Sequence, residues 1–166
     1  GRPFYTDDWI WDSYRAHHPL RILIDPEREQ DILHSFVLMA EQMEHFWMPT
    51  FPEITGDSRR MNSNHGVASV LDAHRKEHGY MPALREGEEE TIPEVHGFER
   101  RQPVAVTLGT SYDQWCLAQL AKELGLTDDY NYFMKVSFNY RNLYNKETGF
   151  FHPKDKNGDF IEPFDY

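Results

Sequence analysis

The sequence is poor in several features that mark particular classes of protein. Only one of its 166 residues is a cysteine, Cys116, which excludes an intrachain disulfide framework and a zinc site built from several cysteines. No apolar run approaches the roughly 20 residues that a membrane-spanning helix needs. Lys and Arg number 17 against 28 Asp and Glu, and the resulting net charge of −11 would repel a phosphate backbone. We therefore expect neither a nucleic-acid partner nor a membrane span.

Aromatic residues, by contrast, are abundant and make up 14% of the sequence. Chains that are too polar to fold are poor in aromatic residues, so disorder is not expected. A chain of this length buries roughly 70% of the surface that its unfolded form exposes, which is enough for one core. The sequence begins at Gly1 rather than at a methionine and ends without a helix cap or polar tail. We therefore expect a soluble, acidic segment of a larger protein.

Apolar spacing and capping residues predict five helices and a mainly α fold built from helical hairpins. The expected ranges are Asp8 to about His18, about Pro26 to Trp47, Asn62 or Ser63 to His78, Ser111 to Gly125, and Thr127 to about Tyr144. The first helix is expected to end before Pro19, because proline disfavours helix in the residue that precedes it. One or two residues separate the last two helices, which must therefore be antiparallel neighbours.

Two other segments are expected to lack helix. The stretch Tyr80–Pro103 contains a run of glutamates and is interpreted as a solvated, irregular segment. The sequence FFHPKDKNGDFI, after the last helix, predicts a small β-hairpin that turns at Asn157-Gly158. Asp155, Asn157 and Asp159 imitate the opening of a calcium loop, but the glycine is misplaced and no glutamate follows at the twelfth position. The hairpin is therefore preferred.

The segment DDWIWDSYRAHHPL concentrates residue types that are common in sugar-binding sites. An aromatic ring such as that of Trp11 can stack on the apolar face of a pyranose, while charged groups bind neighbouring hydroxyls. Asp12 and Arg15 supply a carboxylate and a guanidinium three residues apart, on one helical face. The same spacing would let them simply pair with each other, and the sequence leaves both interpretations open.

Other polar residues have simpler structural explanations. Asn62, Asn64 and His65 lie at an expected helix start, where such residues commonly cap the first turn. Asp113 falls in the first turn of the helix expected from Ser111, where the helix dipole favours a carboxylate. Cys116 is interpreted as a core residue, since buried cysteines are usually inert. No group of metal ligands is expected.

Four stretches, in this order, resemble the glycoside hydrolase family 92 α-mannosidases: YTDDWIWDSYRAHHPL, MNSNHGVASVLDAH, SYDQWCLAQLAKELG and FNYRNLYNKETGFFHPKDKNGDFIEPFDY. Together they account for about half of the chain. The resemblance implies that residues 1–166 are a segment of an (α/α)6 barrel, with no complete domain boundary. It also implies a parent enzyme that is a calcium-dependent, inverting exo-α-mannosidase and removes terminal α-linked mannose from glycans.

The same resemblance implies a division of roles between this segment and the rest of the enzyme. Asp12 would bind hydroxyls of the terminal mannose, Arg15 and Trp11 would shape the pocket, and Asn64 and His65 would lie near it. The general acid, the general bases and the calcium ligands of the family follow the last of the four stretches, so no catalytic or metal-binding residue is expected here. The isolated segment would therefore be inactive, and an extracellular or periplasmic location is implied.

Two alternatives of other kinds stay open. A helical protein-interaction module would show a repeat of about 34 to 45 residues, which the sequence lacks. A different (α/α) barrel carbohydrate hydrolase, such as a glucosidase or a trehalase, would differ in sugar preference and in independence from a chelator. In the preferred interpretation the ligand is a mannose-containing glycan. Five helices cannot close such a barrel, so the rest of the same domain, or another chain, would cover their exposed faces.

Overall fold

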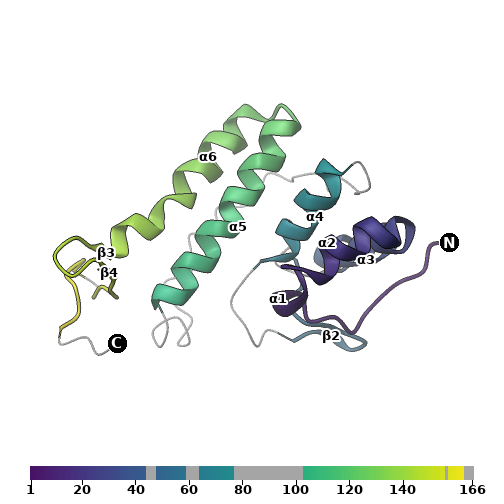
Figure 1. Ribbon diagram of the computed structural model, residues 1–166, viewed down its shortest axis with the longest axis horizontal. Helices are drawn as coiled ribbons and strands as arrows, with labels where there is room; N and C mark the ends of the chain where they lie inside the picture. Colours follow the sequence, from purple (N-terminus) through teal and green to yellow (C-terminus); the bar gives the residue numbers. More distant parts are fainter. Residues whose placement is uncertain (44–47, 59–63, 77–102, 156, 163–166) are drawn as a thin grey trace.

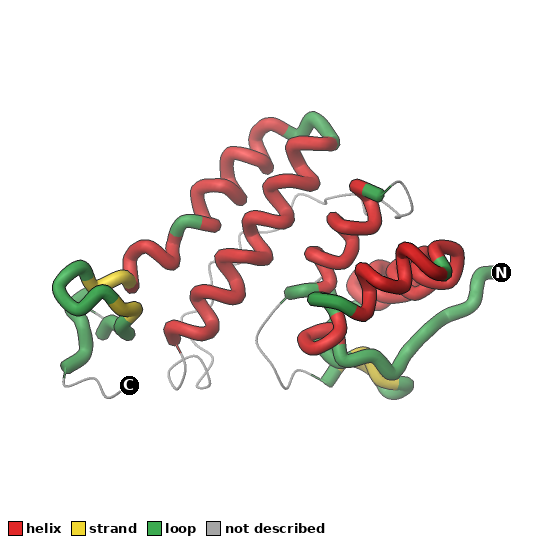
Figure 2. Tube along the Cα trace, viewed as in Figure 1, coloured by secondary structure: helices red, strands yellow, loops and turns green. Residues whose placement is uncertain are grey.

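The computed structural model describes residues 1–43, 48–58, 64–76, 103–155 and 157–162. Its helices are α1 (Ile10–Ser13), α2 (His17–Ile24), α3 (Pro26–Gln42), α4 (Gly66–Arg75), α5 (Pro103–Glu123), α6 (Thr127–Ser137) and the 3-10 helix η1 (Asn139–Leu143). Two antiparallel two-stranded sheets join β1 (Pro52–Glu53) to β2 (Gly56–Asp57) and β3 (Tyr144–Asn145) to β4 (Phe150–Phe151). Helix dominates the described chain, as Figure 2 shows, which confirms the predicted mainly α class.

The helices form two groups (Figure 1). Helices α1 to α4 lie together, with the N-terminal segment along their outer edge, and α5 and α6 form a long antiparallel hairpin beside them. Helix α5 packs against both α4 and α6, so it joins the two groups. Gly125, at φ +74°, lies between α5 and α6 in the left-handed conformation that glycine adopts most easily. The predicted antiparallel pairing of these two helices is confirmed.

The first predicted helix is wrong in one respect. The segment from Asp8 to His18 is divided between α1 and α2, and α2 continues through Pro19 to Ile24. Pro19 is the third residue of α2, where its missing N–H costs nothing because first-turn amides have no partner within the helix. A proline that was interpreted as a stop signal therefore lies in a first turn.

The later helices also differ from their predicted bounds. Helix α5 begins at Pro103, eight residues before the expected start at Ser111, and the last predicted helix changes to 3-10 geometry after Ser137. Helix α3 begins at Pro26 as predicted and ends at Gln42. The remaining expectations for residues 44–47, 59–63 and 77–102, including the glutamate-rich segment, lie outside the described residues.

The core lies between the N-terminal helices and one face of α5. Phe36 and Leu33 of α3 are fully buried there, and Val70 of α4 is 1% exposed. Helix α5 contributes Cys116 and Leu120 to the same cluster, so the interpretation of Cys116 as a core residue is confirmed. Burial and the nearby charge of Asp113 raise the pKa of the Cys116 thiol to about 12, which keeps it protonated and unreactive at neutral pH.

The C-terminal segment contains two turns. Strands β3 and β4 form a small hairpin, and a second turn follows at Asn157-Gly158, flanked by an isolated bridge between Lys154 and Phe160. Gly158 has φ +90°, as the predicted turn requires. The Asp155 carboxylate accepts hydrogen bonds from the amides of Asn157 and Asp159, so it closes the turn. In the part of the chain that the structure describes, no helix combines the length and apolarity needed to cross a membrane.

Candidate functional site

The short helix α1 carries two of the predicted site residues, Trp11 and Asp12, and Arg15 follows shortly after its end. The segment before α1 fixes its position. The amide of Asp8 donates to the carbonyl of Pro52 at 3.1 Å, and the amide of Ile10 donates to the carbonyl of Thr50 at 3.1 Å. The Ile10 side chain is 1% exposed and belongs to the core. Backbone pairing and burial together hold α1 at the surface of the N-terminal helices.

The Arg15 guanidinium lies among aromatic rings at the end of this turn. Its carbon Cζ is 5.8 Å from the centroid of the Trp11 ring and 5.4 Å from that of Tyr14. The Arg15 Nε–H also donates to the Tyr14 hydroxyl at 3.1 Å. A guanidinium at such distances is attracted by the ring electrons, yet it keeps several N–H donors available. The Trp11 ring and the Arg15 guanidinium therefore lie next to each other.

Asp12 lies apart from this group. It lines an open hollow of about 330 Å³ together with Trp9, Ser13 and His17, and with the carboxylates of residues 7 and 8. Its own carboxylate makes no hydrogen bond or ion pair with any residue that the structure describes, Arg15 included. The structure therefore does not contain the Asp12–Arg15 pair that the spacing also allowed, and the carboxylate is exposed.

Asn64 and His65 lie at the start of α4, where both make long-range contacts. The Asn64 side-chain oxygen accepts from the backbone N–H of Met48 at 2.9 Å. The backbone N–H of Asn64 donates to Asp113 Oδ2 at 2.7 Å. The His65 Nδ1 lies 2.5 Å from Asp113 Oδ1. His65 occupies the N-cap position of α4 without a side-chain capping bond, so the capping interpretation is wrong. Asn62 lies outside the described residues.

Asp113 was also misinterpreted. Because α5 begins at Pro103, Asp113 lies well inside this helix and not in its first turn, where the dipole would explain it. The side chain is 1% exposed, and this burial raises the pKa of its carboxyl despite the opposing contacts with His65 and Asn64. A buried carboxylate is costly unless hydrogen bonds satisfy it, and these two contacts do so.

Tyr14 connects the two groups of predicted residues. Its ring centroid is 4.3 Å from that of His65 and 6.2 Å from that of Tyr112 on α5. The Tyr14 hydroxyl accepts the Nε–H of Arg15. The structure thus brings four of the five predicted site residues into one chain of contacts, with Tyr14 at its centre and Asp12 outside it.

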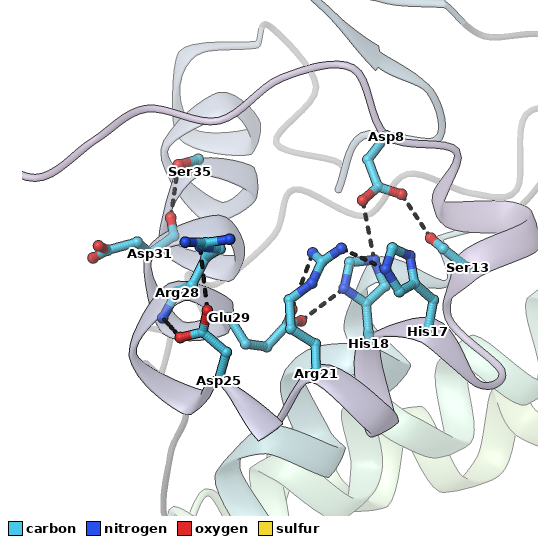
Figure 3. Close-up of polar contacts among 10 residues, drawn as sticks. All are labelled: Asp8, Ser13, His17, His18, Arg21, Asp25, Arg28, Glu29, Asp31 and Ser35. Atoms are coloured by element: carbon cyan, nitrogen blue, oxygen red, sulfur yellow. Dashed lines mark hydrogen bonds and ion pairs between the residues drawn. The ribbon is translucent and has the colours of Figure 1, made fainter. Parts of the chain in front are cut away.

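A second polar cluster, which the sequence did not predict, lies beside α1 (Figure 3). His18 is fully buried, with Nδ1 2.7 Å from Glu29 Oε1 and Nε2 3.6 Å from Asp8 Oδ2. The Ser13 hydroxyl donates to Asp8 Oδ1 at 2.6 Å, and Arg21 donates to Glu29 Oε2 at 3.4 Å. These contacts join α2 to α3 and to the segment that precedes α1.

The electrostatics of this cluster favour a charged His18. Burial by itself lowers the pKa of the imidazole, but the hydrogen bonds and charges of Asp8 and Glu29 outweigh it and raise the pKa to about 9. For Asp8, burial acts to raise the pKa, and the contacts with His18 and Ser13 lower it overall. At neutral pH a positive imidazolium therefore lies between two carboxylates and ties the α1 segment to α3.

No sequence signal pointed to these partners. His18 and Glu29 are eleven positions apart and His65 and Asp113 are 48 apart, so each pair forms only through the tertiary fold. If the start of α5 at Pro103 had been predicted, the helix dipole could not have explained Asp113. That would have marked Asp113 as unusual, although it would not have identified His65 as its partner. In the described ranges, no three His, Cys, Asp or Glu side chains are grouped so that they could hold a metal ion.

Comparisons with known proteins identify the family. The glycosyl hydrolase family 92 catalytic domain matches residues 1–166. No curated protein matches the sequence. Among solved structures, the family GH92 alpha-mannosidase BT3965 from Bacteroides thetaiotaomicron aligns with a TM-score of 0.84 and 29% identity, over 98% of this chain and 24% of that one. Its complex with mannoimidazole gives a TM-score of 0.82 and 28% identity, over 98% and 23%.

The inverting mannosidase BT2199 from Bacteroides thetaiotaomicron VPI-5482 aligns with a TM-score of 0.77 and 28% identity, over 98% of this chain and 25% of that one. The chain thus spans about a quarter of the length of these enzymes. Enzymes of this family have an (α/α)6 barrel, so the helical hairpins described above are part of such a barrel. The chain belongs to glycosyl hydrolase family 92, as a segment of its catalytic domain.

Proposed function

We propose that the protein containing this chain is an exo-α-mannosidase that removes terminal α-linked mannose from glycans with inversion. The observation that carries the proposal is the alignment of nearly the whole chain with structures named as α-mannosidases, one of them named as inverting and one bound to mannoimidazole. Family membership over the full chain favours this function over a helical interaction module.

In this proposal the chain contributes recognition of the sugar. Arg15 keeps guanidinium donors available for adjacent hydroxyls, while Trp11 offers a ring face and holds the guanidinium in place. Asp12 lines the 330 Å³ hollow with a carboxylate that no described residue binds, which suits it to accept hydrogen bonds from hydroxyls. His65 packs on Tyr14, which binds Arg15, and Asn64 joins His65 through their shared contact with Asp113.

The bond-breaking groups are proposed to lie in the remainder of the enzyme. Inversion requires two carboxyl groups roughly 6.5 to 9.5 Å apart, one to protonate the leaving oxygen and one to activate water. The half-buried Asp8 and the buried Glu29 both pair with His18, and Asp113 pairs with His65, so none of the three is available for these roles. The remaining helices of the barrel are proposed to supply these groups and to cover the exposed helix faces.

Calcium dependence is part of the proposal for the complete enzyme only. The described residues offer no fitting group of ligands, so the residues of this chain are given no role in holding the ion. Calcium is hard and prefers several oxygen ligands, which we propose lie outside this segment. An extracellular or periplasmic location is proposed from the family alone.

The test is hydrolysis by the complete protein of aryl α-mannosides and α-mannosyl disaccharides, compared with the matching α-glucosides. The proposal expects release of mannose only, with β-mannose as the first product by proton NMR. Asp12→Asn is expected to raise KM about tenfold, because a hydrogen bond to a charged group is lost. Asp128→Asn, at the exposed start of α6, is the matched control and should leave KM unchanged.

Two further experiments test the proposed calcium dependence and the proposed inactivity of the isolated chain separately. Removal of calcium with a chelator should abolish hydrolysis, and added calcium should restore it; full activity in the chelator would exclude calcium dependence. The 166-residue chain alone should release no mannose. Preferred cleavage of α-glucosides would instead identify another carbohydrate hydrolase of the same architecture.

A further inference from the structure

Asp113 is a buried charge without an assigned role. It lies inside α5 and is 1% exposed. Both of its carboxylate oxygens have a partner: Oδ2 accepts from the backbone N–H of Asn64 at 2.7 Å, and Oδ1 lies 2.5 Å from His65 Nδ1. Replacing a whole buried pair such as Asp113 and His65 by well-packed apolar residues often costs nothing in stability. Its presence therefore calls for an explanation beyond the connection of α4 to α5.

The contact geometry determines where the proton on His65 lies. The carboxylate accepts at His65 Nδ1, so that nitrogen carries the hydrogen, and a neutral ring then has a lone pair on Nε2. No residue in the described part of the chain bonds to Nε2. The His65 ring is 6% exposed and packs on Tyr14 at 4.3 Å. Asp113 thus fixes both the orientation and the tautomer of this imidazole.

The same contacts extend to Arg15. The Tyr14 ring packs on His65, and the Tyr14 hydroxyl accepts the Nε–H of Arg15 at 3.1 Å. A shift of the imidazole would therefore move the ring against which Arg15 is oriented. Binding sites lose affinity when such supporting contacts are removed, because the groups that contact the ligand lose their fixed geometry.

We propose that Asp113 is a positioning residue of the sugar site: it holds His65 with Nε2 as a hydrogen-bond acceptor for a sugar hydroxyl and, through Tyr14, orients Arg15. This inference rests on the proposed function, since the hydroxyls belong to the bound mannose. It assigns Asp113 no contact with the substrate. It also explains why a carboxylate, and not an amide, occupies this place in α5.

Asp113→Asn tests the inference in the complete enzyme. The asparagine oxygen can still accept from the Asn64 amide, but its NH₂ group would face His65 Nδ1 and favour the opposite tautomer. We expect KM for an aryl α-mannoside to rise about tenfold with kcat changed less than about twofold. Asp72→Asn, which removes a partly exposed ion pair with Lys76, is the matched control and should change neither value.

A second measurement reports on the imidazole directly. Nitrogen-15 shifts of His65, assigned with a His65→Gln variant, should show Nδ1–H in the wild type and Nε2–H in Asp113→Asn. A wild-type Nε2–H tautomer, or an unchanged KM in Asp113→Asn, would overturn the inference. If Asp113→Asn does not fold, Tyr14→Phe replaces it: a loss of the hydroxyl that holds Arg15 should raise KM about threefold, and an unchanged KM would overturn the proposed link.

The two measurements also separate this inference from the proposed function. A wild-type enzyme that does not cleave mannosides would overturn the proposed function. The nitrogen shifts do not depend on turnover, so they would still decide whether Asp113 controls the His65 ring.

Discussion

The N-terminal helices and the hairpin of α5 and α6 use their apolar residues differently. In α3, Leu33 and Phe36 are fully buried, and buried ion pairs such as His18–Glu29 connect neighbouring helices. In α6 the only buried residue is Ser137, although the helix carries several aromatic side chains. The aromatic residues exposed along the hairpin and beyond it are Tyr112, Trp115, Tyr132, Phe138, Tyr144 and Phe150.

This difference shows where the described chain buries its core. The N-terminal helices share a core with one face of α5, whereas α6 packs mainly on α5 and otherwise contacts η1, which follows it in the chain. Single exposed apolar residues are normal, but six exposed aromatic side chains are many for α5, α6 and the short segment after them. We propose that the remaining helices of the barrel cover these side chains in the complete enzyme.

The largest expected effect comes from breaking the buried core. Phe36→Ala should lower the free energy of unfolding of the 166-residue chain by about 3 to 5 kcal/mol, because a fully buried ring leaves a cavity. The matched change Phe138→Ala removes a ring that is 39% exposed and should cost about 1 kcal/mol or less. Urea denaturation followed by tryptophan fluorescence measures both.

The comparison becomes sharper in the complete enzyme. If other helices cover Phe138 there, the cost of Phe138→Ala should rise towards that of Phe36→Ala. An equally small cost in both contexts would show that the face of α6 near Phe138 stays open to solvent.

The next effect concerns pH and is confined to the N-terminal part. The folded state raises the His18 pKa from 6.5 to about 9, so its stabilising contribution is complete below pH 6.5 and is lost as the pH rises through 9. The unfolding free energy should fall by about 2 to 3 kcal/mol over that range. In His18→Gln this fall should disappear. A wild-type stability that stays flat between pH 6.5 and pH 9.5 would show that His18 is neutral in the fold.

The smallest effect concerns the contact between the two parts. Glu123 of α5 accepts from Arg75 Nε at 2.9 Å and lies 2.9 Å from His74 Nε2, both in α4. These groups are partly exposed, so Glu123→Gln should cost roughly 0.5 to 1 kcal/mol, and less at high salt. Thermal unfolding at low and high ionic strength measures it. A loss above 2 kcal/mol would mean that the α4–α5 contact depends on this pair more than on Cys116 and Leu120.

The sequence predicted those features that local chemistry determines. Pro26 at the first position of α3, with Asp25 accepting from the Arg28 amide, gave the helix start correctly. The apolar residues of α3 that recur every three or four positions are the ones that became buried. Asn157-Gly158 produced the expected turn for the same reason, since its signal lies within two residues.

Features that depend on distant parts of the chain were missed. The first turns of α5, PVAVTLGT, contain β-branched residues and a glycine, which favour other conformations, so the start at Pro103 was not apparent. The partners of His18 and His65 come from other helices, and nothing in local spacing indicates them. Trp11, Asp12 and Arg15 were identified because they are neighbours in the sequence, and their roles in sugar binding stay predictions.

Asp25 is the residue that ends α2 and also the residue that caps α3. Because a single extended residue connects them, α2 and α3 cannot move far relative to each other. A displacement of α3 would therefore be transmitted through Glu29 and His18 to Asp8, and from there to the turn that carries Asp12. An inserted residue next to Asp25 should disturb the proposed sugar site, whereas the turn between β3 and β4 offers a place where added residues would be tolerated.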